Sequence, residues 1–182
     1  IEAALGRLPE RGAGWRVLDL GTGSGCLLLA FLSELPRSCG LGVDADPDAL
    51  DCARANAARL GLTERTDWRQ GDWAAGIEGS FDVVLANPPS VAEREWETLE
   101  PEVRDHDPKL AMVAGSGGLA AHRRIIPELP RLLAPHGFAC LEIGAGQAEA
   151  VGLMAAQSGL RVAEIKRDMA GTERCVVLAT AR

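Results

Sequence analysis

Aromatic residues are scarce in this chain of 182 residues: they make up 4% of it, and tyrosine is absent. Proteins that hold single-stranded nucleic acid usually stack its bases on aromatic side chains, so few such platforms are available. The net charge of −7 argues against a broad basic surface for nucleic acid. The sequence has no apolar run long enough to span a membrane and no visible signal peptide. We therefore expect a cytoplasmic protein that contacts neither membranes nor nucleic acid directly.

Metal-binding patterns are also missing. The five cysteines are far apart and form no C-x-x-C, and three histidines are too few to build a zinc cluster beside them. We expect no metal site, and we expect the thiols to be reduced and buried. The histidines stand in polar contexts, which predicts solvated side chains and no general base among them: His106, His122 and His136.

Apolar strand patterns alternate with helix patterns along most of the chain. Strands are predicted at residues 15–21, 39–45, 66–73, 81–87, 137–145, 161–168 and 173–181, and helices at 25–35, 47–62 and 147–159. A further helix begins near Leu119, where Pro127 and Pro130 must bend or break it. This alternation predicts a doubly wound α/β sheet, mostly parallel, with helices on both faces. The last two strands have no helix between them, so they must pair antiparallel.

The segment "DLGTGSG" joins the first strand to the first helix. Glycines at alternate positions let the backbone turn sharply and approach a ligand closely. The helix N-terminus just beyond attracts negative charge, such as a carboxylate or a phosphate. The dinucleotide pattern G-x-G-x-x-G is not met because Cys26 takes its last position, and the lysine of a P-loop is absent.

Acidic and aromatic residues follow the next two predicted strands. Asp44 ends the second strand about 20 residues after the glycines, where a carboxylate can accept hydrogen bonds from ribose hydroxyls. An adenosine ligand is therefore expected, with something other than a pyrophosphate attached. Asp72 and Trp73 follow the third strand at the ligand-binding edge of such sheets. Adenine would stack on Trp73 or lie against its backbone, while Asp72 accepts from the exocyclic amine. The alternative is a tryptophan that only covers the edge of the core.

The fourth strand ends in "NPPS", which cannot continue a helix or a central strand. A long polar loop follows, from Pro88 to about Gly118, and loops of this length are usually functional. The alternative to a functional role for "NPPS" is a plain Pro-Pro turn that only closes the strand.

Together, "VLDLGTGSG", Asp44, "GDW" and "NPP" resemble the class I S-adenosylmethionine-dependent methyltransferases. More narrowly, "PEVRDHDP" and "LEIGAGQ" are similar to the HemK/PrmC family, which methylates the glutamine of the Gly-Gly-Gln loop in peptide chain release factors. The resemblance covers almost the whole chain. It implies a Rossmann-like fold with seven strands, S-adenosylmethionine as cofactor, S-adenosylhomocysteine as its product, and a release factor as partner. We also expect a monomer, although no sequence feature specifies the oligomeric state.

The same resemblance implies roles for individual residues. Asn87 would lie between cofactor and substrate, with Asn87 and Pro88 catalytic and with Pro89 and Ser90 completing the substrate site. Family members normally carry an aromatic residue after Pro-Pro, so Ser90 is a departure. The implied cofactor-binding residues are Gly21, Thr22, Gly23, Ser24, Gly25, Asp44, Asp72, Trp73 and Asn87.

We expect one catalytic domain over residues 1–182. The opening "IEAALGRLP" is typical of the middle of a helix, which indicates a truncated start, and the family's N-terminal helical recognition domain is expected to be absent. Two other functions stay open. One is an amino-methyltransferase acting on adenine or guanine of RNA or DNA. The other is a module that binds S-adenosylmethionine with weak or no catalysis because of Ser90.

Overall fold

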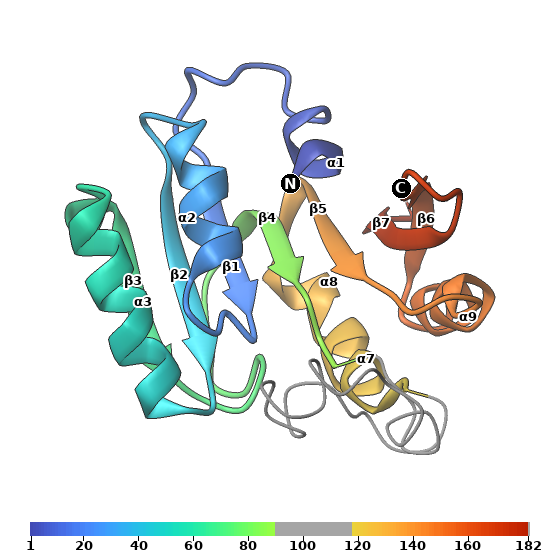
Figure 1. The fold of residues 1–182 in the computed structure, drawn as a ribbon. Coiled ribbons are helices and arrows are strands. Elements are labelled where there is room, and N and C mark those ends of the chain that lie inside the picture. The colour runs from blue at the N-terminus through green and yellow to red at the C-terminus, as the bar shows by residue number, and fades with distance from the viewer. Residues whose placement is uncertain (90–117, 182) are drawn as a thin grey trace.

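A seven-stranded sheet with strand order β3-β2-β1-β4-β5-β7-β6 forms the centre of the molecule (Figure 1). The structure, a computed structural model, describes residues 1–89 and 118–181. The strands are β1 (Arg16–Leu20), β2 (Cys39–Asp44), β3 (Thr66–Gln70), β4 (Phe81–Ala86), β5 (Leu133–Glu142), β6 (Leu160–Arg167) and β7 (Glu173–Thr180). The described helices are α1 (Glu2–Leu5), α2 (Cys26–Ser33), α3 (Pro47–Arg59), α7 (Ala120–Ile125), α8 (Leu129–Leu132) and α9 (Ala148–Gln157), with 3-10 turns η1 (Thr63–Arg65) and η2 (Ile126–Glu128).

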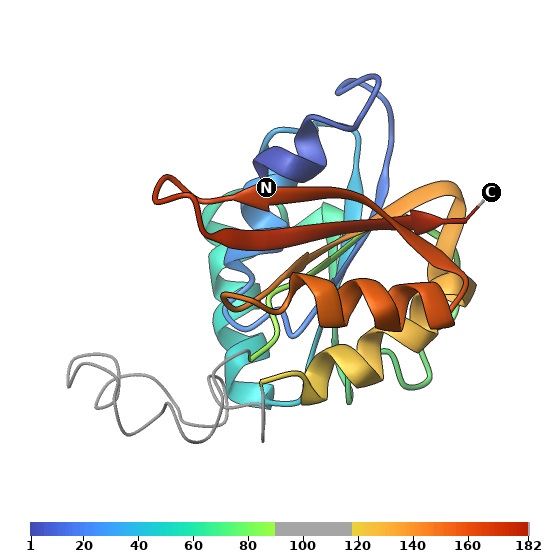
Figure 2. The same cartoon turned by 90° about the vertical axis from the view of Figure 1, so that its right-hand side faces the viewer.

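The pairing of the strands confirms the predicted fold class. Strand β1 is central and pairs in parallel with β2 and β4, and β4 pairs in parallel with β5. Strand β7 runs antiparallel to both of its neighbours, β5 and β6. Figure 2 shows the β6–β7 hairpin from the side, with α9 running beneath it. The hairpin inserts its second strand, rather than its first, beside β5.

Each face of the sheet is covered by its own set of helices. Alternate residues of a strand point to opposite faces, so Val17 packs on the side of α1 and α2 while Leu18 packs on the side of α7, α8 and α9. Both residues are fully buried. Because the inner strands are covered on both sides, they read as continuous apolar runs in the sequence.

Local sequence signals explain where helix α3 begins and ends. The Asp46 carboxylate accepts a hydrogen bond from the Asp48 backbone N–H at 2.9 Å, and Pro47 occupies the first helical turn. At the other end, Gly61 adopts φ +69°, and the Leu62 N–H donates to the Ala57 carbonyl at 2.9 Å. This arrangement satisfies carbonyls that the helix end would otherwise leave unpaired.

Several predicted boundaries were wrong. Strand β3 ends at Gln70 rather than Trp73, because the backbone at Trp73 turns to φ +53° and leaves the sheet. Strand β5 starts at Leu133, earlier than the predicted Gly137, and the first helix is limited to Glu2–Leu5. The predicted break near Pro127 and Pro130 is confirmed, since η2 separates α7 from α8.

Two predictions about side-chain environment were also wrong. Three of the thiols are exposed, not buried: Cys26, Cys39 and Cys52. His122 is 0% exposed, not solvated, while His136 is exposed as predicted and His106 lies outside the described residues. Within the described part of the chain, no helix is both long and apolar enough to cross a membrane.

Candidate functional site

The predicted site residues that the structure describes lie at the carboxyl edge of the four strands β1 to β4. Strand β1 is flanked by β2 on one side and by β4 on the other, so the chain reverses its direction of strand addition between β1 and β4. In open α/β sheets, ligands bind in the crevice at such a reversal. The loop after β1, Asp44 after β2 and Asn87 after β4 all border this position.

The three glycines of the loop after β1 have positive φ angles, but they face different surroundings. A Cβ at Gly21 would lie 2.9 Å from the Trp73 ring, and one at Gly25 would lie 2.8 Å from the Trp68 ring. A Cβ at Gly23 would meet no atom of the described residues within 4 Å. Gly21 and Gly25 are therefore required by the packing of two tryptophans, whereas Gly23 borders open space.

Asp44 lies directly against this loop. Its Oδ2 accepts a hydrogen bond from the Gly23 N–H at 2.7 Å, and its Oδ1 accepts from the Asp46 N–H at 3.0 Å. Each carboxylate oxygen can accept more than one hydrogen bond, so the half-buried carboxylate keeps capacity for a ligand. The loop and the acidic residue are thus brought together beside the open space at Gly23.

Asp19 is a buried acid below the loop, and the sequence interpretation missed it. It is 1% exposed, and its Oδ2 accepts a hydrogen bond from the Thr22 hydroxyl at 2.6 Å. Among the described residues, none bonds to its Oδ1. Burial raises the pKa of Asp19 from 3.8 to about 6, and the nearby charge of Asp44 adds to the increase. A charged residue inside the apolar run "VLDL" was the signal that could have revealed it.

Asp72 and Trp73 lie beyond the end of β3 in two different environments. The Trp73 ring covers Gly21 and packs against one of the two core clusters, so the tryptophan does cover the edge of the core. Asp72 is exposed and forms an ion pair with Arg124 of α7. Nothing in the local sequence pointed to Arg124, because its contact depends on how α7 packs against the sheet.

Asn87 stands one residue beyond β4 and is exposed, whereas Pro88 behind it is buried and Pro89 half-buried. Strands β1 and β4 pair Leu20 with Ala86, so Asn87 follows β4 at the edge of the sheet where the glycine loop follows β1. The predicted contribution of Ser90 lies outside the described residues.

The charges around the open space at Gly23 indicate what kind of ligand fits. The carboxylates of Asp19 and Asp44 accept hydrogen bonds from residues of the loop. A third carboxylate, that of Asp72, follows β3 at the same edge of the sheet, where Arg124 offsets its charge. Such a set disfavours a polyphosphate and suits a cationic ligand carrying hydroxyls. A nucleoside sulfonium such as S-adenosylmethionine matches this set of acceptors and negative charges.

Comparison with known proteins finds relatives that are named methyltransferases. The family model "Methyltransferase small domain" matches residues 3–101. The release factor glutamine methyltransferase of Rhodospirillum rubrum is 45% identical over 97% of this chain and 54% of that protein. The Caulobacter vibrioides protein of the same name is 43% identical over 97% of this chain and 61% of its own length. The chain thus spans between half and two thirds of these curated relatives.

Solved structures show the same fold at lower identity. The ribosomal protein L11 methylase of Lactobacillus delbrueckii subsp. bulgaricus superimposes with a TM-score of 0.69 at 19% identity, covering 93% of this chain and 72% of that one. TrmN of Thermus thermophilus superimposes with a TM-score of 0.68 at 23% identity. The match covers 98% of this chain and 47% of that one. With a family model that matches more than half of its residues, the chain belongs to the methyltransferase small domain family.

Proposed function

We propose that this chain transfers a methyl group from S-adenosylmethionine to the side-chain amide nitrogen of the glutamine in the Gly-Gly-Gln motif of peptide chain release factors. The observation that carries the proposal is the exposed Asn87, held by a buried proline at the edge of the sheet where the glycine loop follows β1. The relatives named release factor glutamine methyltransferase, which match nearly the whole chain, support the choice of substrate.

The chemistry explains why an asparagine and a proline carbonyl suit this reaction. An amide nitrogen is a poor nucleophile because its lone pair is delocalised into the carbonyl. The cofactor supplies an electrophilic sulfonium methyl group. The Asn87 side-chain oxygen and the Pro88 carbonyl can each accept an N–H bond from the target amide, which orients the nitrogen and stabilises its growing positive charge. Each such bond lowers the barrier by about 2–4 kcal/mol.

The rigidity of the turn adds to this effect. Each proline has a fixed φ, and Pro88 is also buried, so the backbone that carries the Pro88 carbonyl is positioned before the substrate binds. A strong general base is not required, because the nitrogen-bound proton becomes acidic once the methyl group is attached. The buried His122 is likewise not assigned as a general base. Its Nε2 is 2.8 Å from the Glu142 carbonyl, and burial lowers its pKa.

The cofactor would occupy the open space at Gly23. Asp44 would accept from the ribose hydroxyls and Asp72 from the adenine amine, while the buried Asp19 would act on the positively charged methionine end through its charge below the loop. Trp73 would border the adenine. The remaining proposed cofactor contacts are Gly21, Thr22, Ser24, Gly25 and Asn87.

The proposed partner is a release factor that presents its Gly-Gly-Gln loop to a monomeric catalytic domain. An acidic chain with few aromatic residues counts against nucleic acid as the direct partner. The proposed position of the target amide is beside Asn87.

A labelled-methyl assay tests the proposal. The chain is offered radiolabelled S-adenosylmethionine with release factor, tRNA, rRNA or DNA, and a release factor whose motif glutamine is changed to alanine serves as the matched control. We expect label only on the unaltered release factor. Label on nucleic acid alone would support an amino-methyltransferase of bases, and cofactor binding without transfer would support a binding module.

A further inference from the structure

The helical run α7–η2–α8 holds the segment after β3 at two points. Arg131 of α8 donates hydrogen bonds to the Ile77 carbonyl at 2.6 Å and to the Ala74 carbonyl at 2.9 Å. Glu128 fixes the same guanidinium, at 2.8 Å from its Nε. About two turns earlier, Arg124 of α7 pairs with the Asp72 carboxylate. Backbone and side chain of this segment are therefore both tied to one helical run.

Stability alone does not explain the Arg124–Asp72 pair. Both side chains are about half exposed, at 54% and 58%, and exposed ion pairs contribute little to stability because water screens them. The Arg131 bonds already hold the turn, since they engage its backbone carbonyls. What the Arg124 contact adds is the orientation of one carboxylate.

The orientation bears on the adenine end of the cofactor site. The Gly71 N–H donates to the Asp44 carbonyl at 2.9 Å, which ties the start of the Asp72 segment to the residue proposed at the ribose. Arg124 occupies the Oδ2 of Asp72, which leaves Oδ1 as the acceptor that can face a ligand. A carboxylate held by one oxygen presents the other in a fixed direction, so less freedom is lost on binding.

We infer that Arg124 is a positioning residue for cofactor recognition: it orients Asp72 so that its free oxygen accepts the exocyclic amine of adenine and selects adenine over purines that lack this amine. The inference rests on the proposed function, because it takes S-adenosylmethionine as the ligand. Arg124 touches Asp72 and not the reacting atoms, so its effect is on cofactor affinity and base selectivity rather than on the methyl-transfer step.

Calorimetry with two ligands tests this role. S-adenosylhomocysteine carries the amine, and S-inosylhomocysteine has an oxygen in its place. We expect the unaltered protein to prefer the first by about tenfold, the effect of one hydrogen bond to a charged acceptor. In Arg124→Gln the preference should fall to about threefold or less, through weaker binding of the adenosyl ligand. Arg124→Lys should restore part of it, because a cation is retained.

Two further variants separate positioning from a general loss of charge. Arg123→Gln removes the neighbouring exposed arginine of the same helix and should behave as the unaltered protein. Asp72→Ala should abolish the preference, and adding Arg124→Gln to it should change nothing more, since the two residues act through one contact. Circular dichroism of each variant verifies that the fold is retained.

Contrary outcomes have distinct meanings. An unchanged preference in Arg124→Gln overturns the inference and leaves the proposed function standing. Tighter binding of S-adenosylhomocysteine by Arg124→Gln also overturns it, because Arg124 would then compete with adenine for Asp72. If the unaltered protein binds neither ligand, the proposed function falls and the inference falls with it.

Discussion

At the scale of single residues, the site depends on polar groups whose surroundings differ sharply. Asn87 is exposed and Asp19 is buried, although both lie near the glycine loop. An exposed amide can meet a substrate, whereas a buried carboxyl responds to its dielectric surroundings. Substitutions at these two positions should therefore produce different phenotypes.

Asn87→Ala should reduce methyl transfer while leaving the fold intact. The variant removes one of the two proposed acceptors for the target amide, so kcat should fall by about 100-fold to 1,000-fold. The midpoint of thermal unfolding should stay the same because the side chain is exposed. Steady-state kinetics on a release factor measure the effect. A rise in KM with unchanged kcat would contradict a transition-state role.

Ser90→Tyr should raise activity, because an aromatic ring would pack on the planar target amide. By analogy with base stacking, the gain corresponds to about 1–3 kcal/mol. The kcat/KM for a release factor measures it, with Ser90→Ala as a control that adds no contact area. If Ser90→Tyr and Ser90→Ala have the same kcat/KM, the absence of an aromatic residue at position 90 does not limit activity.

Asp19 should make stability depend on pH in a specific direction. Its folded pKa, about 6, lies above the 3.8 of an ordinary aspartate, so the native state holds the proton more tightly than the unfolded state. The stabilisation from this residue is complete below pH 3.8 and is lost as the pH rises through 6. The loss amounts to about 3 kcal/mol.

Asp19→Asn cannot ionise and should not show this loss. Urea unfolding of both proteins at pH 4 and at pH 7 isolates the contribution, because the other carboxylates cancel in the difference. The stability of the variant relative to the unaltered protein should rise with pH. A constant difference across the range would mean that Asp19 is not desolvated.

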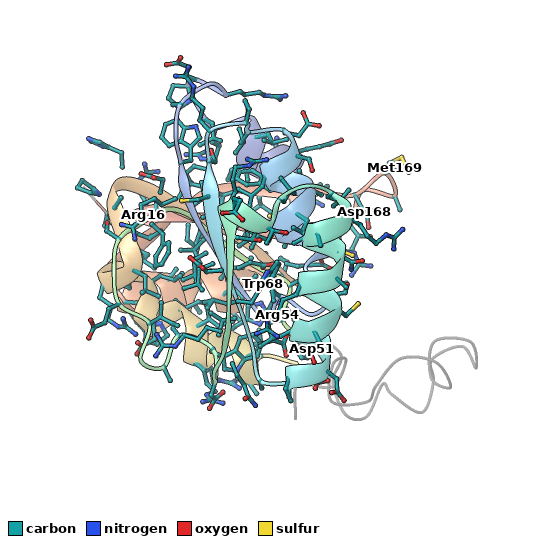
Figure 3. The ribbon with its side chains drawn as sticks, turned by 90° about the vertical axis from the view of Figure 1, so that its left-hand side faces the viewer. Arg16, Asp51, Arg54, Trp68, Asp168 and Met169 are labelled. Carbon is teal, nitrogen blue, oxygen red and sulfur yellow. The ribbon has the colours of Figure 1, made fainter. Side chains whose placement is uncertain are left out.

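At the scale of elements, the glycine loop is shaped as much by its neighbours as by any ligand. Trp68 of β3, labelled in Figure 3, fills the space above Gly25 and Gly42, where Cβ atoms would approach its ring to 2.8 and 2.5 Å. The start of α2 is thereby packed against β2 and β3. One glycine pattern thus combines a packing requirement with a binding requirement.

Gly25→Ala should destabilise the fold more than Gly23→Ala. Both residues have positive φ, so each alanine carries a backbone cost of about 1–2 kcal/mol. Only Gly25 adds a collision with Trp68, which should raise the loss by a further ~1–3 kcal/mol. Chemical denaturation compares the two. Equal losses would show that Trp68 shifts freely.

The inner strands and their helices were predictable because local signals agreed with the fold. Strands β1 and β4 are apolar runs bounded by glycine or proline, and Pro127 marks the break after α7. The start of β5 was missed because Leu133 pairs with Phe81 by itself, and regular pairing resumes only at Phe138 after a shift in register. A single pair ahead of such a shift leaves no alternating apolar pattern for the sequence to show.

The site was predicted only where it follows strand ends. Asp44 and Asn87 could be placed from the order of strands, since carboxyl ends of parallel strands share one edge. The burial of His122 and the Arg124–Asp72 pair depend on how α7 docks, which no residue spacing encodes. The packing roles of Gly21 and Gly25 likewise require knowledge of where two tryptophan rings lie.

At the scale of the whole molecule, cofactor binding should stabilise the fold, because the proposed site joins the ends of four strands. At S-adenosylhomocysteine concentrations 100-fold above Kd, the free energy of unfolding should rise by about 2.7 kcal/mol. For a chain of this size, the melting temperature should rise by about 5–10 °C. Differential scanning fluorimetry measures the shift. In Asp44→Ala, the rise in melting temperature on adding S-adenosylhomocysteine should be smaller. An unchanged rise in this variant would show that Asp44 does not contact the cofactor.

The placement of β7 between β5 and β6 has a consequence for the order of folding. During synthesis, residues 1–142 emerge first and can form five strands, but the open edge of β5 finds its neighbour only when residues 173–180 leave the ribosome. Until then, the row of unpaired amides and carbonyls along β5 resembles an aggregation-prone sheet edge. The nascent protein therefore depends on β7 to cover the exposed edge of β5, which could otherwise pair with another chain.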